Sequence, residues 1–279
     1  MIFATGLVLV AAALHATWNL LLKTSPDADR DLTSWGLYLV GGLLVVPVSV
    51  ALGGPGLAAV PWLALSGLVH VAYIVGLVSA YEHGDFSLAY PLARGGGALA
   101  AALGGALLLG DHLPAPAWAS IAVVALALGS LMGPGVSLWS VRGALLTAAA
   151  IGTYTVIDAH GARVSVDPLA YGLTTTATAA VGVSLVFLAR RRHRALVAAW
   201  PQHRLRWLVA GACLATAYTL VVVAVRHAPV GYVAVLRESS VVLGALVGWR
   251  FLHESLGGRR LVSSLVILAG MLGLVASTL

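Results

Sequence analysis

Four charged side chains interrupt long apolar stretches of this sequence, and they are Arg94, Asp158, Arg237 and Glu238. A charge near the centre of a bilayer costs about 2.5–3.5 kcal/mol on insertion scales, so the four must face a cavity or one another rather than lipid. Two are cations and two are anions, which allows them to form a paired network. Charges in this setting are typical of substrate and ion pathways.

Two interpretations are open for Arg94, which lies in the stretch YPLARGGG at residues 90–97. Its guanidinium carries a fork of N–H donors that suits a carboxylate, phosphate or phosphonate, so Arg94 and Arg237 are candidates for binding an anionic substrate. Alternatively, Arg94 forms a structural ion pair with Glu238 or Asp158. The same choice applies to these carboxylates, which are either candidates for ion coupling by proton exchange or permanent partners of an arginine.

Polar side chains four residues apart lie on one face of a helix and extend this set. Such pairs within apolar stretches are His15 with Asn19, Tyr90 with Arg94, and Tyr154 with Asp158. The candidate substrate-binding residues are His15, Trp18, Asn19, Tyr73, Tyr90, Arg94, Tyr154 and Arg237. No spacing is typical of a metal site and no cofactor motif is present, so neither a metal nor a cofactor is expected.

The elements that position these residues follow from the composition, which is 60% hydrophobic and 9% charged with a mean hydropathy of +0.97. About 20 apolar helical residues cross a bilayer core roughly 30 Å thick. Ten stretches satisfy this, at about 2–22, 33–53, 62–81, 86–109, 115–133, 142–161, 168–189, 206–225, 230–251 and 260–278. The sequence predicts an all-α integral membrane protein with ten transmembrane helices, embedded in lipid and not bound to nucleic acid.

An internal repeat organises these helices. Residues 91–113 align without gaps with residues 234–256, which places Arg94 on Arg237 and Asp111 on Glu254. We therefore expect two five-helix repeats, at 1–135 and 140–279. An odd number of spans in each repeat gives the two halves opposite topology, so the repeat is inverted. Asp111 and Glu254 end equivalent helices, where capping of neighbouring helices or gate contacts are the expected roles.

The motifs HATWNLLLK at 15–23, AYPLARGGG with LLLGDHL at 89–113, and RESS with FLHESL at 237–256 resemble the drug/metabolite transporter superfamily, EamA type. The similarity covers nearly the whole chain. It implies a ten-helix secondary transporter with a central cavity between the halves, lined mainly by helices 1, 3, 4, 6, 8 and 9. The resemblance also implies that both termini face the cytoplasm.

The distribution of basic residues indicates the opposite orientation. With both termini outside, the cytoplasmic connections carry twelve basic residues, whereas the reverse orientation leaves only Arg163 and Arg226 there. The positive-inside rule therefore favours external termini.

The combined prediction is a secondary active transporter of the inner membrane that moves a small organic metabolite by alternating access. An anionic or zwitterionic substrate is slightly favoured, and export of cationic or aromatic drugs or metabolites is the alternative. A channel and a membrane-embedded enzyme are remote alternatives, because no catalytic motif occurs and paired charges suit occlusion better than an open pore. The sequence leaves open whether the protein forms a homodimer.

Overall fold

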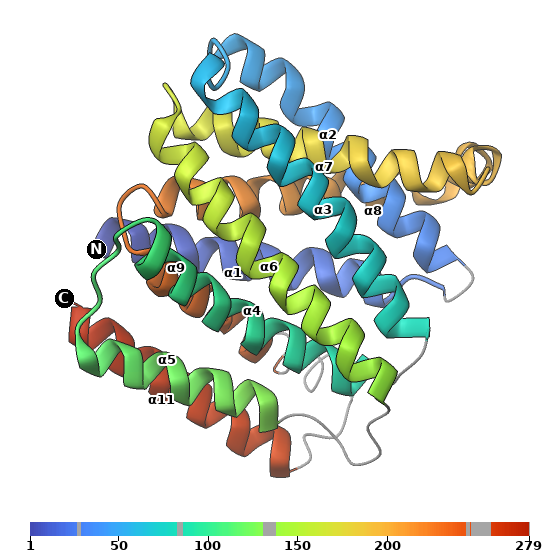
Figure 1. The fold of residues 1–279 in the computed structure, drawn as a ribbon. Coiled ribbons are helices and arrows are strands. Elements are labelled where there is room, and N and C mark those ends of the chain that lie inside the picture. The colour runs from blue at the N-terminus through green and yellow to red at the C-terminus, as the bar shows by residue number, and fades with distance from the viewer. Residues whose placement is uncertain (27–28, 83–85, 131–137, 244–245, 247–257, 279) are drawn as a thin grey trace.

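A computed structural model describes the chain except for residues 27–28, 83–85, 131–137, 244–245, 247–257 and 279 (Figure 1). Of the described residues, 88% are helical and none lies in a strand. The elements are α1 (Ile2–Lys23), α2 (Arg30–Ala51), the short 3-10 helix η2 (Leu57–Ala59), α3 (Val60–Glu82), α4 (Phe86–Leu108), α5 (Ala115–Ser130), α6 (Leu138–Val164), α7 (Pro168–Ala189), α8 (His193–Ala224), α9 (Val230–Arg237) and α11 (Gly258–Thr278).

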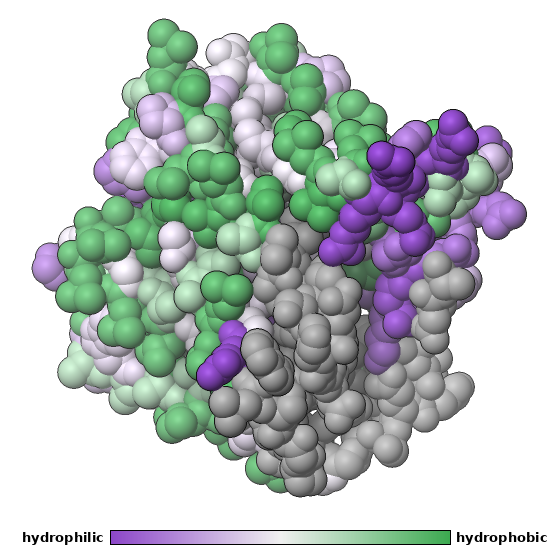
Figure 2. Space-filling view, turned by 45° about the vertical axis from the view of Figure 1, so that its right-hand side comes forward, coloured by the Kyte–Doolittle hydropathy of each residue, from purple (hydrophilic) through white to green (hydrophobic). Residues whose placement is uncertain are grey.

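The described helices have the length and composition expected for a bilayer. Five segments are long and apolar enough to cross a membrane, namely α1, α2, α7, α8 and residues Leu261–Thr278 of α11, and shorter apolar segments lie in α3, α4 and α5. Many of their outward side chains are apolar, such as Leu43, Leu107, Leu126 and Leu272, which are 65–79% exposed. Figure 2 shows this apolar surface over the left and upper parts of the face in view. Because water does not favour such a surface, it indicates contact with lipid.

Helices from the two predicted repeats pack directly against each other. Helix α4 packs against α6 and α9, α1 packs against α8 and α9, α3 packs against α6, and α5 packs against α11. Glycines allow the closest approach: a Cβ at Gly97 would lie 2.6 Å from Cγ2 of Ile151, and one at Gly105 would lie 2.9 Å from Cβ of Val230. Small residues therefore bring α4 close to both α6 and α9, as is common in membrane helix packing.

The sequence predicted one continuous helix over residues 230–251, but α9 ends at Arg237. The amide of Glu238 donates to the Val235 carbonyl at 3.0 Å, and the amide of Val241 donates to the Glu238 carbonyl at 2.9 Å. Both bonds span three residues instead of the four of an α-helix, so the chain tightens at Glu238 before helical residues resume at 239. By contrast, α4 passes through Pro91 without interruption.

Helix α8 begins thirteen residues before the predicted start at residue 206. Its 32 residues extend about 48 Å, which exceeds a bilayer core of roughly 30 Å. The region around its start carries exposed arginines, among them Arg190, Arg194 and Arg204. Figure 2 shows hydrophilic side chains gathered on one side, where α7 meets α8. The first part of α8 is therefore the basic extension that the sequence assigned to a connection.

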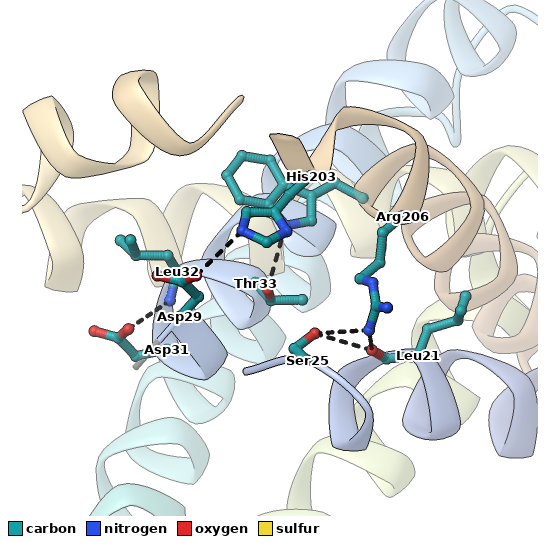
Figure 3. Close-up of polar contacts among 9 residues, drawn as sticks. Leu21, Ser25, Asp29, Asp31, Leu32, Thr33, His203 and Arg206 are labelled. Carbon is teal, nitrogen blue, oxygen red and sulfur yellow. Dashed lines mark hydrogen bonds and ion pairs between the residues drawn. The ribbon is translucent and has the colours of Figure 1, made fainter. Parts of the chain in front are cut away.

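Polar contacts attach this extension to the connection between α1 and α2 (Figure 3). The Arg206 guanidinium donates to the Leu21 carbonyl at 2.8 Å and to the Ser25 hydroxyl at 3.1 Å. His203 Nε2 lies 3.3 Å from a carboxylate oxygen of Asp29. The two basic connections therefore lie together, on the side of the molecule opposite both termini (Figure 1).

Candidate functional site

The candidate site is a cavity of about 70 Å³ lined by helices of both predicted repeats. It receives side chains from α1, α2, α3, α4, α6, α7, α8 and α9, so α2 and α7 join the helices that the family resemblance implied. Six of the predicted site residues line it, and they are His15, Trp18, Tyr73, Arg94, Tyr154 and Arg237. Tyr38, His70, Thr175, Thr176 and Tyr218 complete the polar part of the lining.

Arg94 and Glu238 form a buried ion pair at the break in α9. The distance from Nη2 to Oε1 is 2.8 Å, and Nε donates to Oε2 at 2.9 Å. The two side chains are only 7% and 1% exposed. One charge-assisted hydrogen bond and one close ion contact hold the guanidinium against α9. Of the two interpretations of Arg94, the geometry matches the structural ion pair.

Arg237, the residue aligned with Arg94, lies in a different setting. It is 6% exposed and lines the cavity, yet its Nε has no hydrogen-bond partner. The hydroxyls of Ser239 and Ser240, which follow the break in α9, are also buried without partners. Across the described part of the chain, no carboxylate lies within ion-pairing distance of Arg237. A buried, unpaired guanidinium is unfavourable and would be stabilised by an anion entering the cavity.

Asp158 is buried behind the cavity wall and is held by two tyrosines. Its Oδ1 accepts a hydrogen bond from the Tyr171 hydroxyl at 3.1 Å, and its Oδ2 accepts one from the Tyr218 hydroxyl. The residue is 2% exposed, and Tyr218, which lines the cavity, separates it from the open space. Asp158 is therefore partnered by hydroxyl groups instead of an arginine.

Aromatic rings from three helices form one wall of the cavity. His70 of α3 stacks on Tyr154 of α6 with ring centroids 4.2 Å apart. Tyr73 lies 5.8 Å from Tyr154, and Tyr218 lies 6.0 Å from His70, both in edge-on contacts. Such packing holds the rings in fixed orientations and presents both π-surfaces and polar ring atoms to a solute.

The remaining predicted residues are placed as follows. The rings of His15 and Trp18 meet edge-on at 4.9 Å on the α1 side of the cavity. The Asn19 amide donates to the His15 carbonyl at 2.7 Å and does not line the cavity. Tyr90 lies in a part of α4 whose side chains are outside the described ones.

A second ion pair joins the helix ends on the side of the termini. Asp111 lies 2.8 Å from an Arg163 nitrogen, and its other oxygen accepts the backbone amide of Val230 at 2.7 Å. Arg163 also donates to the Val225 carbonyl at 3.3 Å. Asp111 therefore caps α9, which confirms the capping role expected for it. Its counterpart Glu254 lies outside the described residues.

Sequence reasoning missed several lining residues for an identifiable reason. Thr175 and Thr176 bond to carbonyls of their own helix at 3.0 and 3.3 Å, so their hydroxyls carry no unusual signal. Tyr38 and Tyr218 stand alone within apolar stretches, where one tyrosine does not define a polar face. His70 is the exception, because its spacing of three residues from Tyr73 within an apolar stretch places both on one helix face and makes it a weaker candidate for the lining.

Comparisons with known proteins agree with the fold. The model of the EamA-like transporter family matches residues 138–276, which corresponds to the second predicted repeat. A solved crystal structure, described only as that of a protein, is similar over 97% of this chain and 95% of its own, with a TM-score of 0.77 and 19% sequence identity. At this identity the likeness establishes the fold alone. No curated protein matches the chain. The chain is a multi-pass membrane protein that belongs to the EamA-like transporter family of the drug/metabolite transporter superfamily.

Proposed function

We propose that this protein is a secondary active transporter that moves a small organic anion or zwitterion across the inner membrane by alternating access. Members of its family are transporters and not enzymes. In this proposal the solute occupies the cavity between the two halves, and Arg237 binds its anionic group. Arg94 and Glu238 act as a structural pair that holds α4 against α9.

The observation that carries this proposal is the state of Arg237. The residue is 94% buried, lines the cavity and has an unpartnered Nε, whereas the Arg94 guanidinium is paired with Glu238. Burial without a counter-charge costs free energy, and this cost is recovered when a carboxylate or another anion binds. A guanidinium fork suits such a group because it donates two parallel hydrogen bonds.

Alternating access requires two halves that can exchange roles, and the helix packing supports this arrangement. In an inverted repeat of five helices each, α1 corresponds to α6, α3 to α8 and α4 to α9. The contact between α1 and α8 then corresponds to the contact between α6 and α3. In the same way, the contact between α1 and α9 corresponds to the contact between α6 and α4. All four contacts occur. We therefore propose ten spans in two inverted repeats.

The basic extension of α8 supports one orientation. Arg190, Arg194 and Arg204 are exposed on the side of the molecule opposite the termini. Positively charged connections are retained in the cytoplasm. We therefore propose that this basic side is cytoplasmic and that both termini lie outside.

The aromatic wall favours one second candidate, a transporter of organic cations. Tyrosine rings can bind a cation through their π-faces, and Asp158 lies directly behind Tyr218. In that case the carboxylate of Asp158, and not Arg237, supplies the charge that selects the solute.

Counterflow in proteoliposomes separates the two candidates. Vesicles containing purified protein are preloaded with unlabelled lactate, alanine or choline, and uptake of the same labelled compound is followed. We expect saturable counterflow of lactate or alanine. It should fall by at least about tenfold in Arg237→Gln, because a charge-assisted hydrogen bond is lost. Arg226→Gln, outside the cavity lining, is the matched control. Choline counterflow that persists in Arg237→Gln and disappears in Asp158→Asn would instead support the cation transporter.

A further inference from the structure

The cavity contains a second polar group whose hydrogen-bonding role can be deduced from its surroundings. Nδ1 of His70 lies 2.9 Å from the Ser66 carbonyl oxygen and 3.3 Å from the Ser66 hydroxyl. A carbonyl oxygen cannot donate, so the proton of this contact must be on Nδ1 of the histidine. In the neutral ring, Nε2 is then an acceptor.

Nε2 of His70 has no hydrogen-bond partner among the described side chains and backbone groups. His70 is 7% exposed and lines the cavity. Nδ1 is directed back at the preceding turn of α3, so Nε2 lies at the opposite, distal end of the ring. Stacking on Tyr154 at 4.2 Å prevents the ring from turning away. An acceptor held in a fixed position on a largely buried residue is stabilised when a donor reaches it.

The cavity therefore offers two different recognition groups. Arg237 provides N–H donors with a positive charge, and His70 provides a neutral acceptor, with the carboxyl group of Asp158 behind the same wall. A water-sized group needs about 10–15 Å³ of such space, so a volume of about 70 Å³ holds roughly five to seven such groups. The site thus fits a small solute with an anionic end and a donor end.

We propose that His70 selects the substrate by accepting a hydrogen bond at Nε2 from an ammonium or hydroxyl group of the solute, whose carboxylate is bound by Arg237. This inference rests on the proposed function and deepens it. The substrate class is a small carboxylate that carries an N–H or O–H donor a few atoms away. A simple carboxylate of the same size leaves Nε2 unpartnered and binds less tightly.

Four probes of similar size test this inference on purified, reconstituted protein. Propionate has only the carboxylate, lactate adds a hydroxyl, alanine adds an ammonium, and ethylamine has a donor without a carboxylate. Each is added unlabelled as a competitor in the counterflow assay. The concentration that halves uptake of the labelled compound is measured. We expect lactate, alanine or both to compete about tenfold better than propionate, and ethylamine to compete poorly. The comparison of lactate with alanine identifies the donor group.

The variant His70→Phe keeps the aromatic ring and its stacking on Tyr154 but removes the acceptor. It should bring lactate and alanine to within about threefold of propionate, without weakening propionate. His160→Phe is the matched control, because His160 also lies 4.2 Å from an aromatic ring, that of Trp62, but does not line the cavity. It should retain the wild-type preference.

The outcomes separate this inference from the proposed function. Equal competition by propionate, lactate and alanine, unchanged in His70→Phe, overturns the role of His70 while leaving carboxylate transport through Arg237 intact. Counterflow of choline alone overturns the proposed function itself. Exchange of none of the four probes contradicts the inference, because it specifies a solute of this size and chemistry.

Discussion

Arg94 and Arg237 occupy aligned positions of the predicted internal repeat and both line the cavity, yet their partners differ. Arg94 is held by both carboxylate oxygens of Glu238, whereas Arg237 has an unpartnered Nε at the cavity. The reason lies in the next residue of each repeat. Glu238 follows Arg237, but its counterpart after Arg94 is Gly95. The first repeat therefore has no acid at the position of Glu238, and Glu238 itself is paired with Arg94.

The packing around Gly95 is tight for any side chain, including a second acid. A Cβ there would lie 3.1 Å from both the Ala125 carbonyl oxygen and Cβ of Leu128. These distances are shorter than ordinary van der Waals contact, and the neighbours belong to helix α5. The asymmetry is therefore built into the contact of α4 with α5. It assigns a structural role to one arginine and, in our proposal, a binding role to the other.

The largest effect is expected from removing the acid. Glu238→Gln leaves the Arg94 guanidinium buried without its counter-charge, which should lower the free energy of unfolding by about 3–5 kcal/mol. Thermal unfolding of the purified protein in detergent measures this loss. The double variant Arg94→Met with Glu238→Leu is the control, since it removes both charges and should recover most of the stability. A Glu238→Gln protein as stable as the wild type would show that the pair is not structural.

Arg237 should respond in the opposite direction. Arg237→Met replaces an unpaired, buried charge with an apolar side chain of similar length, so the free energy of unfolding should rise by about 1–2 kcal/mol. The same thermal assay, without added solute, measures this change. Arg94→Met leaves Glu238 buried without its counter-charge, so the free energy of unfolding should fall. This variant is the matched comparison. If Arg237→Met also destabilises the protein, Arg237 has a structural partner and the contrast between the arginines fails.

Much of the fold follows from the sequence because a bilayer imposes a simple length requirement on each helix. The start of α8 and the break in α9 do not follow from it. Arginine, alanine and leucine all favour helix, so the basic residues near the start of α8 mark the membrane boundary and not the end of the helix. The break at Glu238 occurs without a proline or glycine, in the run LRESS, and therefore has no local sequence signal.

The site was predictable in its charges and less so in its partners. An apolar environment identifies Arg94, Asp158, Arg237 and Glu238 because each is costly there. Which carboxylate pairs with which arginine depends on the path of α9 past α4. The hydrophobic periodicity of the sequence does not specify this path. Likewise, Tyr218 reaches Asp158 from another helix, 60 residues away along the chain. Such contacts come from tertiary packing alone.

A smaller effect is expected at the second ion pair, which extends the comparison to partly exposed charges. Asp111 and Arg163 are 10% and 28% exposed, and Asp111 also caps the Val230 amide. Asp111→Ala removes both contacts and should lower the free energy of unfolding by about 1–2 kcal/mol. Asp111→Asn, which can still accept the amide, should lose less than half of that. Equal losses in the two variants would mean that the ion pair, not the cap, provides the stability.

The smallest effect is expected at the surface, where burial no longer contributes. Arg192 and Asp31 form an ion pair at 2.9 Å, the same distance range as Arg94 and Glu238, but their side chains are 43% and 45% exposed. Water and salt screen such a pair, so Asp31→Asn should change the free energy of unfolding by no more than about 0.5 kcal/mol. Measuring the free energy of unfolding of Asp31→Asn and of Glu238→Gln in the same buffer isolates the effect of burial, because the two ion pairs have similar distances. A loss at Asp31 comparable to that at Glu238 would show that distance alone sets these energies, and the unpaired state of Arg237 would then carry no special cost for an anion to relieve.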